Sequence, residues 1–272
     1  MALTTGKYRE GLTNKESFLI SSLARSDKKV FTAEDARAVA GEPAIKMLSS
    51  LAKKKWVLKL KRGLYTIVPL DIGVKGADSF IMHNFVIASK LAEPYYIGYW
   101  SALNYYGFSD QLPITTFIAT TTARKGLKIL DASYLFVQVS QARFFGTADI
   151  EIEGEKVKIS DRNKTIADCL DHPEHGGGID EIARSIYFST EEIDIKKIVS
   201  YALKMGNITI IKRLGYILDA CSILEKYCAA FDKIELSKGY SLLDPVSPKK
   251  GKYNERWLLL VNREIAPERW MY

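Results

Sequence analysis

The 272-residue sequence predicts an α+β protein, in which a small domain of three helices and a basic β-hairpin precedes a larger mixed α+β domain. Capped amphipathic segments and an alternating strand pair occupy the first 70 residues. Segments rich in β-branched residues, and then helical segments, follow from residue 80. The charge also changes between the two parts. The first 70 residues hold 14 Lys/Arg and 6 Asp/Glu, a net charge of +8, and the remaining 25 basic and 26 acidic residues give −1.

Three helices are expected in the first part, each with its own start or stop signal. Thr13 stands three residues before Glu16, which is the spacing of a capping box. Thr32 is placed to cap a second helix, and Gly41 is placed to end it. Pro43 suits the first turn of a third helix. The buried face of this third helix is predicted to consist of Ala44, Ile45, Leu48, Leu51 and Ala52.

A strongly basic stretch, KKKWVLKLKRGLYTIVP, runs from the end of the third helix into a hairpin. Leu58 and Leu60 alternate with lysines, as in a half-buried strand, and Gly63 provides the positive φ that a tight turn needs. Three helices and a basic hairpin are the layout of a winged helix-turn-helix. The candidate DNA-binding residues are Lys46, Ser49, Ser50, Lys53, Lys54, Lys55, Lys59, Lys61 and Arg62.

The basic stretch is also compatible with roles that involve no DNA. Lysines on an edge strand prevent aggregation, and a basic helix face also suits plain solvent. A winged helix can serve as a protein–protein module without any role in DNA binding. The charge asymmetry and the predicted layout together favour duplex DNA.

The rest of the chain predicts a linker at 71–79 and an α+β domain at 80–272, with a subdivision near 190–206 left open. Strands are expected within 114–160, including a hairpin in ADIEIEGEKVKIS, and helices are expected from 160 to about 231. Short strands close the chain at GYSLLDP and RWLLLVNREI. The aromatic residues between Tyr95 and Tyr106 suit a packed core better than a stacking platform for bases.

Catalytic and metal-binding motifs are weak, and the sequence predicts no enzyme, cofactor or metal. Asp171, His172, Glu174 and His175 are possible metal ligands, but after a helix C-terminus histidines more often serve capping. Cys169, Cys221 and Cys228 lack the spacing of a zinc site, and we expect free, buried thiols.

A magnesium-dependent nuclease is the main enzymatic alternative. Its candidate ligands are the carboxylates from Asp149 to Glu155, beside Lys156 and Lys158. The acidic residues alternate with isoleucines, however, as on any solvated strand face. No apolar stretch is long enough to span a bilayer, and the N-terminus lacks the apolar core of a secretory signal, so we expect a cytoplasmic protein without membrane contact.

Several segments together resemble the AbiE abortive-infection antitoxins (the AbiEi family), winged-helix regulators of type IV toxin–antitoxin systems. The segments are LKLKRGLYTIVP, YYIGYWSALNYYG, KISDRNKTIADCLDHPEHGGG, IIKRLGYILD and YSLLDP…RWLLLVN. They extend over nearly the whole chain. One departure is that Asn163 and Lys164 stand where relatives tend to have an acidic-Arg-Thr run.

The resemblance implies a repressor that binds inverted repeats in double-stranded DNA of its own promoter, as a monomer or as a cooperative dimer. It also implies that the larger domain counters a nucleotidyltransferase-like toxin, without requiring a stable complex, as part of phage defence. The family offers no catalytic residues. A second basic cluster, SPKKGKYNERW, either adds DNA contacts or is a solvated loop.

Overall fold

The computed structural model describes residues 9–26, 28–72 and 80–270. Its contacts divide the chain into two compact units. The first unit comprises residues 1–91 with the short segments 128–132 and 151–156, and the second comprises the remaining residues. A linker is expected at 71–79, and residues 73–79 of it lie outside the described residues. The expected domain limits at 1–70 and 80–272 stay a prediction.

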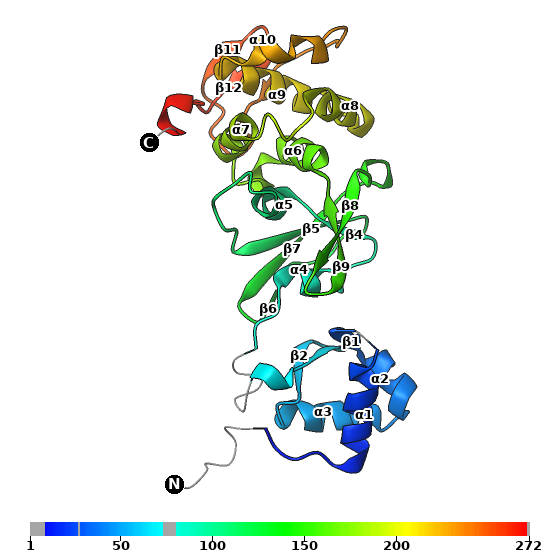
Figure 1. The fold of residues 1–272 in the computed structure, drawn as a ribbon. Coiled ribbons are helices and arrows are strands. Elements are labelled where there is room, and N and C mark those ends of the chain that lie inside the picture. The colour runs from blue at the N-terminus through cyan, green and yellow to red at the C-terminus, as the bar shows by residue number, and fades with distance from the viewer. Residues whose placement is uncertain (1–8, 27, 73–79, 271–272) are drawn as a thin grey trace. The chain divides into compact units, whose positions relative to one another are not determined.

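The N-terminal part of the first unit contains three helices and a three-stranded antiparallel sheet of order β1-β3-β2 (Figure 1). In chain order its elements are α1 (Asn14–Ala24), β1 (Val30–Thr32), α2 (Ala33–Ala40), α3 (Ala44–Lys53), β2 (Val57–Lys61) and β3 (Leu64–Ile67). A single apolar core joins the helices to the sheet, with Leu19, Phe31, Leu48, Leu51 and Val57 almost completely buried. The predicted winged helix-turn-helix, and with it the α+β fold class, is confirmed.

Local capping signals account for where the first helices begin. Thr13 and Glu16 form the expected capping box, with the Thr13 N–H donating to Glu16 Oε2 at 2.8 Å. A second capping box joins Thr32 and Asp35, and Gly41 follows the end of α2 with a φ of 66°. Pro43 is the N-cap residue of α3, one position before the first turn in which we expected it.

The six-stranded sheet has the order β6-β7-β5-β4-β9-β8 and mixes parallel with antiparallel pairs. Its strands are β4 (Tyr95–Ile97), β5 (Thr115–Thr120), β6 (Leu127–Ile129), β7 (Ala132–Gln138), β8 (Thr147–Ile152) and β9 (Glu155–Ser160). Two short helices, α4 (Asn84–Ala88) and α5 (Tyr99–Tyr105), flank β4 in the sequence. Tyr96 and Tyr99 are buried in the core, as the packed-core interpretation of the aromatic cluster predicts.

Helices follow the six-stranded sheet and lead to a small third sheet of order β10-β12-β11 (Figure 1). The helices are α6 (Arg162–Asp171), α7 (Ile179–Phe188), α8 (Ile195–Met205), α9 (Ile208–Ala220) and α10 (Leu224–Tyr227), and the strands are β10 (Ser241–Leu242), β11 (Lys252–Asn254) and β12 (Leu259–Val261). The free cysteines Cys169 and Cys221 are buried as expected, whereas Cys228 is exposed. None of the helices among the described residues is long and apolar enough to cross a membrane.

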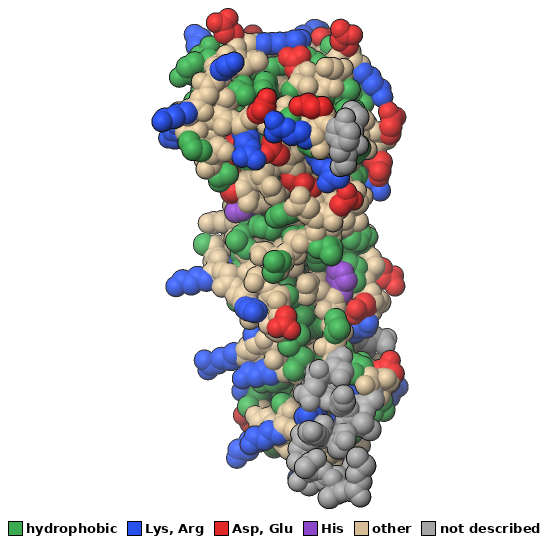
Figure 2. Space-filling model, turned by 90° about the vertical axis from the view of Figure 1, so that its left-hand side faces the viewer, with side chains coloured by type: hydrophobic (Ala, Val, Ile, Leu, Met, Phe, Trp, Pro, Cys, Tyr) green, Lys and Arg blue, Asp and Glu red, His purple; other side chains and the backbone are tan. Residues whose placement is uncertain are grey.

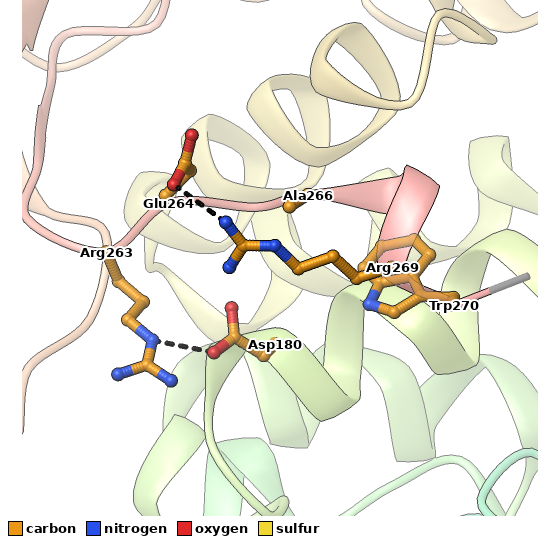
Figure 3. Close-up of a pocket in the computed structure, with 6 residues that line it drawn as sticks. All are labelled: Asp180, Arg263, Glu264, Ala266, Arg269 and Trp270. Carbon is orange, nitrogen blue, oxygen red and sulfur yellow. Dashed lines mark hydrogen bonds and ion pairs between the residues drawn. The ribbon is translucent and has the colours of Figure 1, made fainter. Parts of the chain in front are cut away.

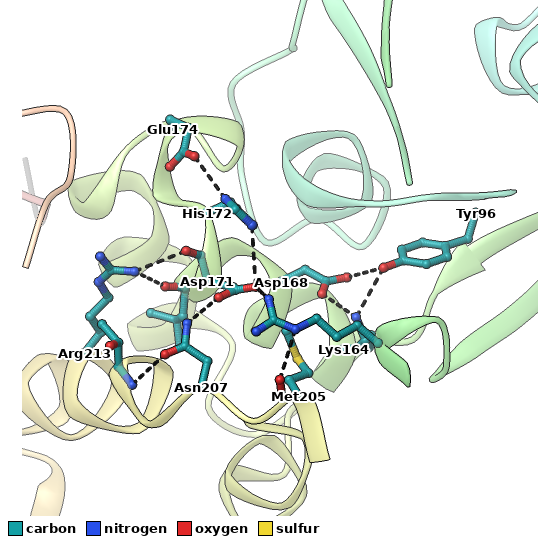
Figure 4. Close-up of polar contacts among 12 residues, drawn as sticks. Tyr96, Lys164, Asp168, Asp171, His172, Glu174, Met205, Asn207 and Arg213 are labelled. Atoms are coloured by element: carbon teal, nitrogen blue, oxygen red, sulfur yellow. Dashed lines mark hydrogen bonds and ion pairs between the residues drawn. The ribbon is translucent and has the colours of Figure 1, made fainter. Parts of the chain in front are cut away.

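A buried ion pair within α6 is linked by hydrogen bonds to Tyr96 of β4. Lys164 and Asp168 lie one turn apart on α6, with 0% and 2% of their side chains exposed. Asp168 Oδ2 accepts a hydrogen bond of 2.9 Å from the Tyr96 hydroxyl, and Lys164 Nζ donates to the same hydroxyl at 3.2 Å (Figure 4). Lys164 is therefore part of the protein interior.

Helix α9 packs against an indole ring through a glycine. A Cβ atom added at Gly215 would lie 2.1 Å from Cζ3 and 2.2 Å from Cη2 of Trp257. The indole is buried, and its Nε1 donates to Asp219 Oδ2 at 3.1 Å. Glycine at position 215 thus allows the ring to lie directly on the helix backbone.

Candidate nucleic-acid interface

Helix α3 presents three exposed polar side chains on successive turns. These are Lys46, Ser49 and Lys53. The Ser49 hydroxyl donates to the carbonyl oxygen of Ile45 at 3.1 Å, which leaves its oxygen free to accept further hydrogen bonds. Within the described part of the chain, neither lysine has an acidic partner. Both ammonium groups are therefore available to an external anion.

Ser50 and Lys54, also predicted to contact DNA, are half-buried and contact α1 instead of pointing freely into solvent. Ser50 Oγ donates to Glu16 Oε1 at 2.7 Å, and Lys54 Nζ donates to Glu16 Oε2 at 2.7 Å. Only 6% of the Glu16 side chain is exposed. The carboxylate thus serves both as part of the α1 capping box and as the link between α1 and α3.

The contacts of Glu16 also determine its protonation. Burial raises the pKa of the Glu16 carboxyl, but hydrogen bonds from Lys54, Thr13 and Ser50 outweigh this effect and lower the pKa to about 2. The sequence predicts only the capping position of Glu16 and not its role as a link. A signal for that role exists, because Glu16 precedes Leu19 by three and Leu23 by seven residues and so falls on the buried face of α1.

Replacing Glu16 with glutamine is expected to destabilise the N-terminal unit by about 2 kcal/mol at pH 7, because the buried charge-assisted hydrogen bonds are weakened. Since the folded-state pKa of about 2 lies below the ordinary 4.5, the carboxylate stabilises the fold above about pH 4.5 and this contribution is lost as the pH falls towards 2. Urea unfolding between pH 7 and 2.5 measures both effects. Glu34→Gln, at an exposed position of α2, is the matched control, and an equal loss in both variants would contradict the prediction.

The β2–β3 hairpin carries the remaining basic candidates. Lys59 and Arg62 are exposed, and Lys61 is half-buried. The strands pair Lys59 with Tyr65 and Lys61 with Leu64, with a bulge between these two pairs. Gly63 has a φ of 78°, so the expected glycine turn is present. The turn and the bulge bring Arg62 to the tip of the wing.

The predicted DNA-binding residues therefore lie on two consecutive elements, α3 and the wing. Lys55 lies two residues after the end of α3, with a φ of 63°, and is half-buried. The residues with the greatest exposure are Lys46, Ser49, Lys53, Lys59 and Arg62. Figure 2 shows Lys and Arg side chains projecting from the N-terminal unit, in the lower part of that view. This arrangement can place positive charge against a polyanion at both a helix and a hairpin.

Neighbouring lysines balance part of the negative charge of the acidic hairpin that the nuclease alternative uses. Asp149 forms an ion pair of 2.9 Å with Lys158 on the adjacent strand, and Glu155 forms one of 3.0 Å with Lys90. Glu151 and Glu153 are exposed. Among the described residues, three or more candidate metal ligands converge elsewhere, at the end of α6, and not on this hairpin.

A polar pocket in the second unit is lined by two arginines and a tryptophan (Figure 3). Arg263 Nε donates to Asp180 Oδ2 at 2.6 Å, and Arg269 lies 3.6 Å from Glu264 in an ion pair. Because each guanidinium already faces a carboxylate, the pocket offers little net charge to an anionic ligand. It is a weaker candidate for nucleic-acid binding than α3 and the wing.

Comparison with known proteins places the N-terminal segment in a family. Residues 19–68, which run from α1 to the end of the wing, match the sequence model of a family described as transcriptional regulator, AbiEi antitoxin. The N-terminal segment is of the AbiEi type. The predicted resemblance is thereby confirmed for residues 19–68, and the AbiEi match supports a general role as an antitoxin and transcriptional regulator.

Beyond the AbiEi-type segment, the comparisons bear on the fold alone. The crystal structure of the RV2827C protein from Mycobacterium tuberculosis resembles this chain with a TM-score of 0.69 and 12% sequence identity. The alignment covers 95% of this chain and 94% of that one, so the larger α+β part shares the same architecture. A search of curated proteins gives no match.

Proposed function

We propose that this protein is a DNA-binding transcriptional repressor and the antitoxin of a type IV toxin–antitoxin system. The observation that carries the proposal is the exposed basic surface formed by α3 and the wing within the AbiEi-type segment. In this proposal Lys46, Ser49 and Lys53 contact base edges and phosphates in the major groove. Lys59, Lys61 and Arg62 contact the DNA backbone beside the groove, and Lys55 adds positive charge where the two elements meet.

Ser50 and Lys54 take an indirect part in this mechanism. Since both are held by Glu16, they would set the position of α3 on the domain more than they contact DNA. The proposed target is an inverted repeat in the promoter of the protein's own operon, bound by a monomer or a cooperative dimer in the cytoplasm. The α+β part would counter a nucleotidyltransferase-like toxin without a stable complex, as part of phage defence.

The wing can be tested by the triple substitution Lys59→Ala, Lys61→Ala and Arg62→Ala. We expect the affinity for the upstream promoter DNA to fall by at least about tenfold, and the slope of log K against log[salt] to decrease by roughly 0.9 for each lost phosphate contact. Fluorescence anisotropy with a labelled promoter duplex at several salt concentrations measures both quantities. The matched control removes three exposed basic side chains, those of Lys15 on α1, Arg25 at the C-cap of α1 and Arg37 on α2.

Three outcomes separate the hypotheses. An unchanged affinity in the wing variant, or an equal loss in the control variant, contradicts the assignment of the wing. The absence of any DNA binding at low salt favours a protein–protein module instead. Magnesium-dependent cleavage of DNA or RNA that is lost in Asp149→Ala supports the nuclease alternative.

The antitoxin role needs a separate experiment in cells. A nucleotidyltransferase-like gene from the same operon is expressed with and without this protein, and growth is recorded. Rescue by both the wild type and the wing variant would separate toxin neutralisation from DNA binding. Failure of the wild type to restore growth would contradict the antitoxin proposal.

A further inference from the structure

Three side chains with metal-binding atoms converge where α6 ends. His172, Glu174 and His175 each present one ligand atom, and these atoms all lie within 4.8 Å of one another. His172 and Glu174 point towards each other in Figure 4, with 3.1 Å between His172 Nδ1 and Glu174 Oε1. Two imidazoles and one carboxylate are a common ligand set for Zn²⁺ and related transition metals.

The second ring nitrogen of His172 faces another carboxylate. His172 Nε2 lies 3.6 Å from Asp171 Oδ2. Asp171 is itself held by Arg143, whose Nη1 is 2.8 Å from Oδ2, and by Asn207, whose Nδ2 donates to Oδ1 at 2.5 Å. A metal-bound histidine typically has such a carboxylate behind it, which orients the ring and makes the other nitrogen a better ligand.

The backbone around the cluster is firmly held. Pro173–His175 forms a single 3-10 turn, and the side chain of Pro173 is buried. The Pro173 carbonyl oxygen accepts hydrogen bonds from the N–H groups of Gly176, at 3.0 Å, and Gly178, at 2.9 Å. Two ligands are thus carried by a closed turn, and His172 is the residue that ends α6. Ligands that are positioned before binding lose little conformational freedom when the metal arrives.

Charge and access also suit a cation at this place. The carbonyl end of α6 carries partial negative charge, and Glu174 adds a carboxylate. Of the nearby cations, Arg143 is paired with Asp171, and Arg213 donates to the backbone oxygens of Leu170 and Asp171. The His172 and Glu174 side chains are 38% and 34% exposed, so an ion and its water ligands can enter from solvent.

We propose that His172, Glu174 and His175 form a binding site for a divalent transition metal ion, with Zn²⁺ as the best-fitting metal. Zn–ligand bonds of about 2.0–2.2 Å place tetrahedral ligands on the order of 3.4 Å apart, so the side chains move inwards by about an ångström. The metal replaces the hydrogen bond between His172 and Glu174. Three protein ligands leave a coordination position for water, which makes this an open site. The oxygen-preferring ions Mg²⁺ and Ca²⁺ are disfavoured by the two imidazoles.

The proposal is tested with the full-length protein after removal of any affinity tag and of bound metal by a chelator. Zn²⁺ is titrated in competition with a chromophoric chelator, and Co²⁺ is used as a spectroscopic probe of ligand geometry. We expect one Zn²⁺ per chain and visible Co²⁺ absorption of a four- or five-coordinate site. Zn²⁺ is also expected to raise the unfolding temperature, because it binds the folded state.

Variants separate this site from other metal-binding groups. His172→Ala combined with His175→Ala should abolish both signals, and Glu174→Gln should weaken Zn²⁺ binding by at least about tenfold, the scale at which even a supporting residue affects metal affinity. His83→Ala and Cys228→Ser remove the chain's third histidine and its exposed thiol, and both should leave binding unchanged.

Two results would overturn the proposal. One is that the wild-type protein shows no saturable Zn²⁺ binding, and the other is that His83→Ala or Cys228→Ser loses as much affinity as the double variant. Circular dichroism shows whether the double variant is folded. If it is not, Glu174→Gln decides alone, and an unchanged affinity in that variant contradicts the site. The outcome is independent of the DNA-binding experiment, which concerns α3 and the wing.

Discussion

Replacing Asp168 with alanine is expected to lower the free energy of unfolding of the second unit by about 3–5 kcal/mol. The substitution leaves the Lys164 ammonium fully buried, with the Tyr96 hydroxyl as its remaining hydrogen-bond partner among the described residues. Burial raises the pKa of the Asp168 carboxyl while Lys164 opposes this, so desolvation is a large cost for this pair. When Asp168 is removed, the Lys164 ammonium stays desolvated but loses the attraction of the carboxylate that offset the desolvation cost.

Urea unfolding followed by circular dichroism measures the loss. The matched control is Asp149→Ala, which breaks a pair whose side chains are about half exposed and should cost no more than about 1 kcal/mol. Replacing both buried partners, by Lys164→Met with Asp168→Leu, should restore much of the stability, because neither charge of this pair then remains in the interior. A double variant that is less stable than Asp168→Ala would show that the pair itself, and not the unpaired charge, determines the effect.

Gly215→Ala is expected to cost about 3 kcal/mol, at the upper end for an overpacked core. Alanine is the better helix former by about 1 kcal/mol, yet its Cβ would lie little more than 2 Å from the Trp257 ring. The ring cannot simply move away. The indole Nε1–H donates to Asp219 Oδ2 at 3.1 Å, and the ring packs against Phe231 with ring centroids 5.2 Å apart. The backbone N–H of Trp257 donates to Asn254 Oδ1 at 2.8 Å, which also fixes the position of the residue. Steric overlap therefore outweighs helix propensity.

A double-mutant cycle with Trp257→Leu identifies the cause. The smaller side chain should destabilise the wild-type protein, but in the Gly215→Ala background it should cost far less, because it also removes the overlap. Circular dichroism is the appropriate signal, since the substitution changes the tryptophan fluorescence. Simple additivity of the two losses would mean that the glycine is required for a reason other than Trp257.

The elements that the sequence predicts well are those whose signals are local. The Thr13–Glu16 capping box, the cap at Thr32, the glycine turn of the wing and the hairpin around Gly154 depend on residues a few positions apart. Two strands that the sequence does not predict, β1 and β4, are three residues long and exist through distant pairing. β1 pairs Val30 with Thr66 of β3, and β4 pairs Ile97 with Ile159 of β9. Three residues carry too little periodicity to indicate a strand.

The same division between local and distant contacts applies to the candidate interface. Helical periodicity correctly placed Lys46, Ser49 and Lys53 on the exposed side of α3. It also placed Ser50 and Lys54 there, because no local rule reveals that both side chains donate hydrogen bonds to a carboxylate of α1. Likewise, the helix that begins at Ile208 ends at Ala220 and Ser222 has a φ of 57°, so the helical run expected up to about residue 231 is interrupted there.

The link between Glu16, Ser50 and Lys54 also bears on how α3 can change during evolution. Positions 50 and 54 are tied to position 16, so a substitution at any of the three disturbs the other two. Lys46, Ser49 and Lys53 have no such tie to α1. New binding preferences can therefore arise at these three exposed positions at little cost to folding. The orientation of α3, by contrast, depends on its hydrogen bonds to Glu16 of α1, so it changes only together with α1.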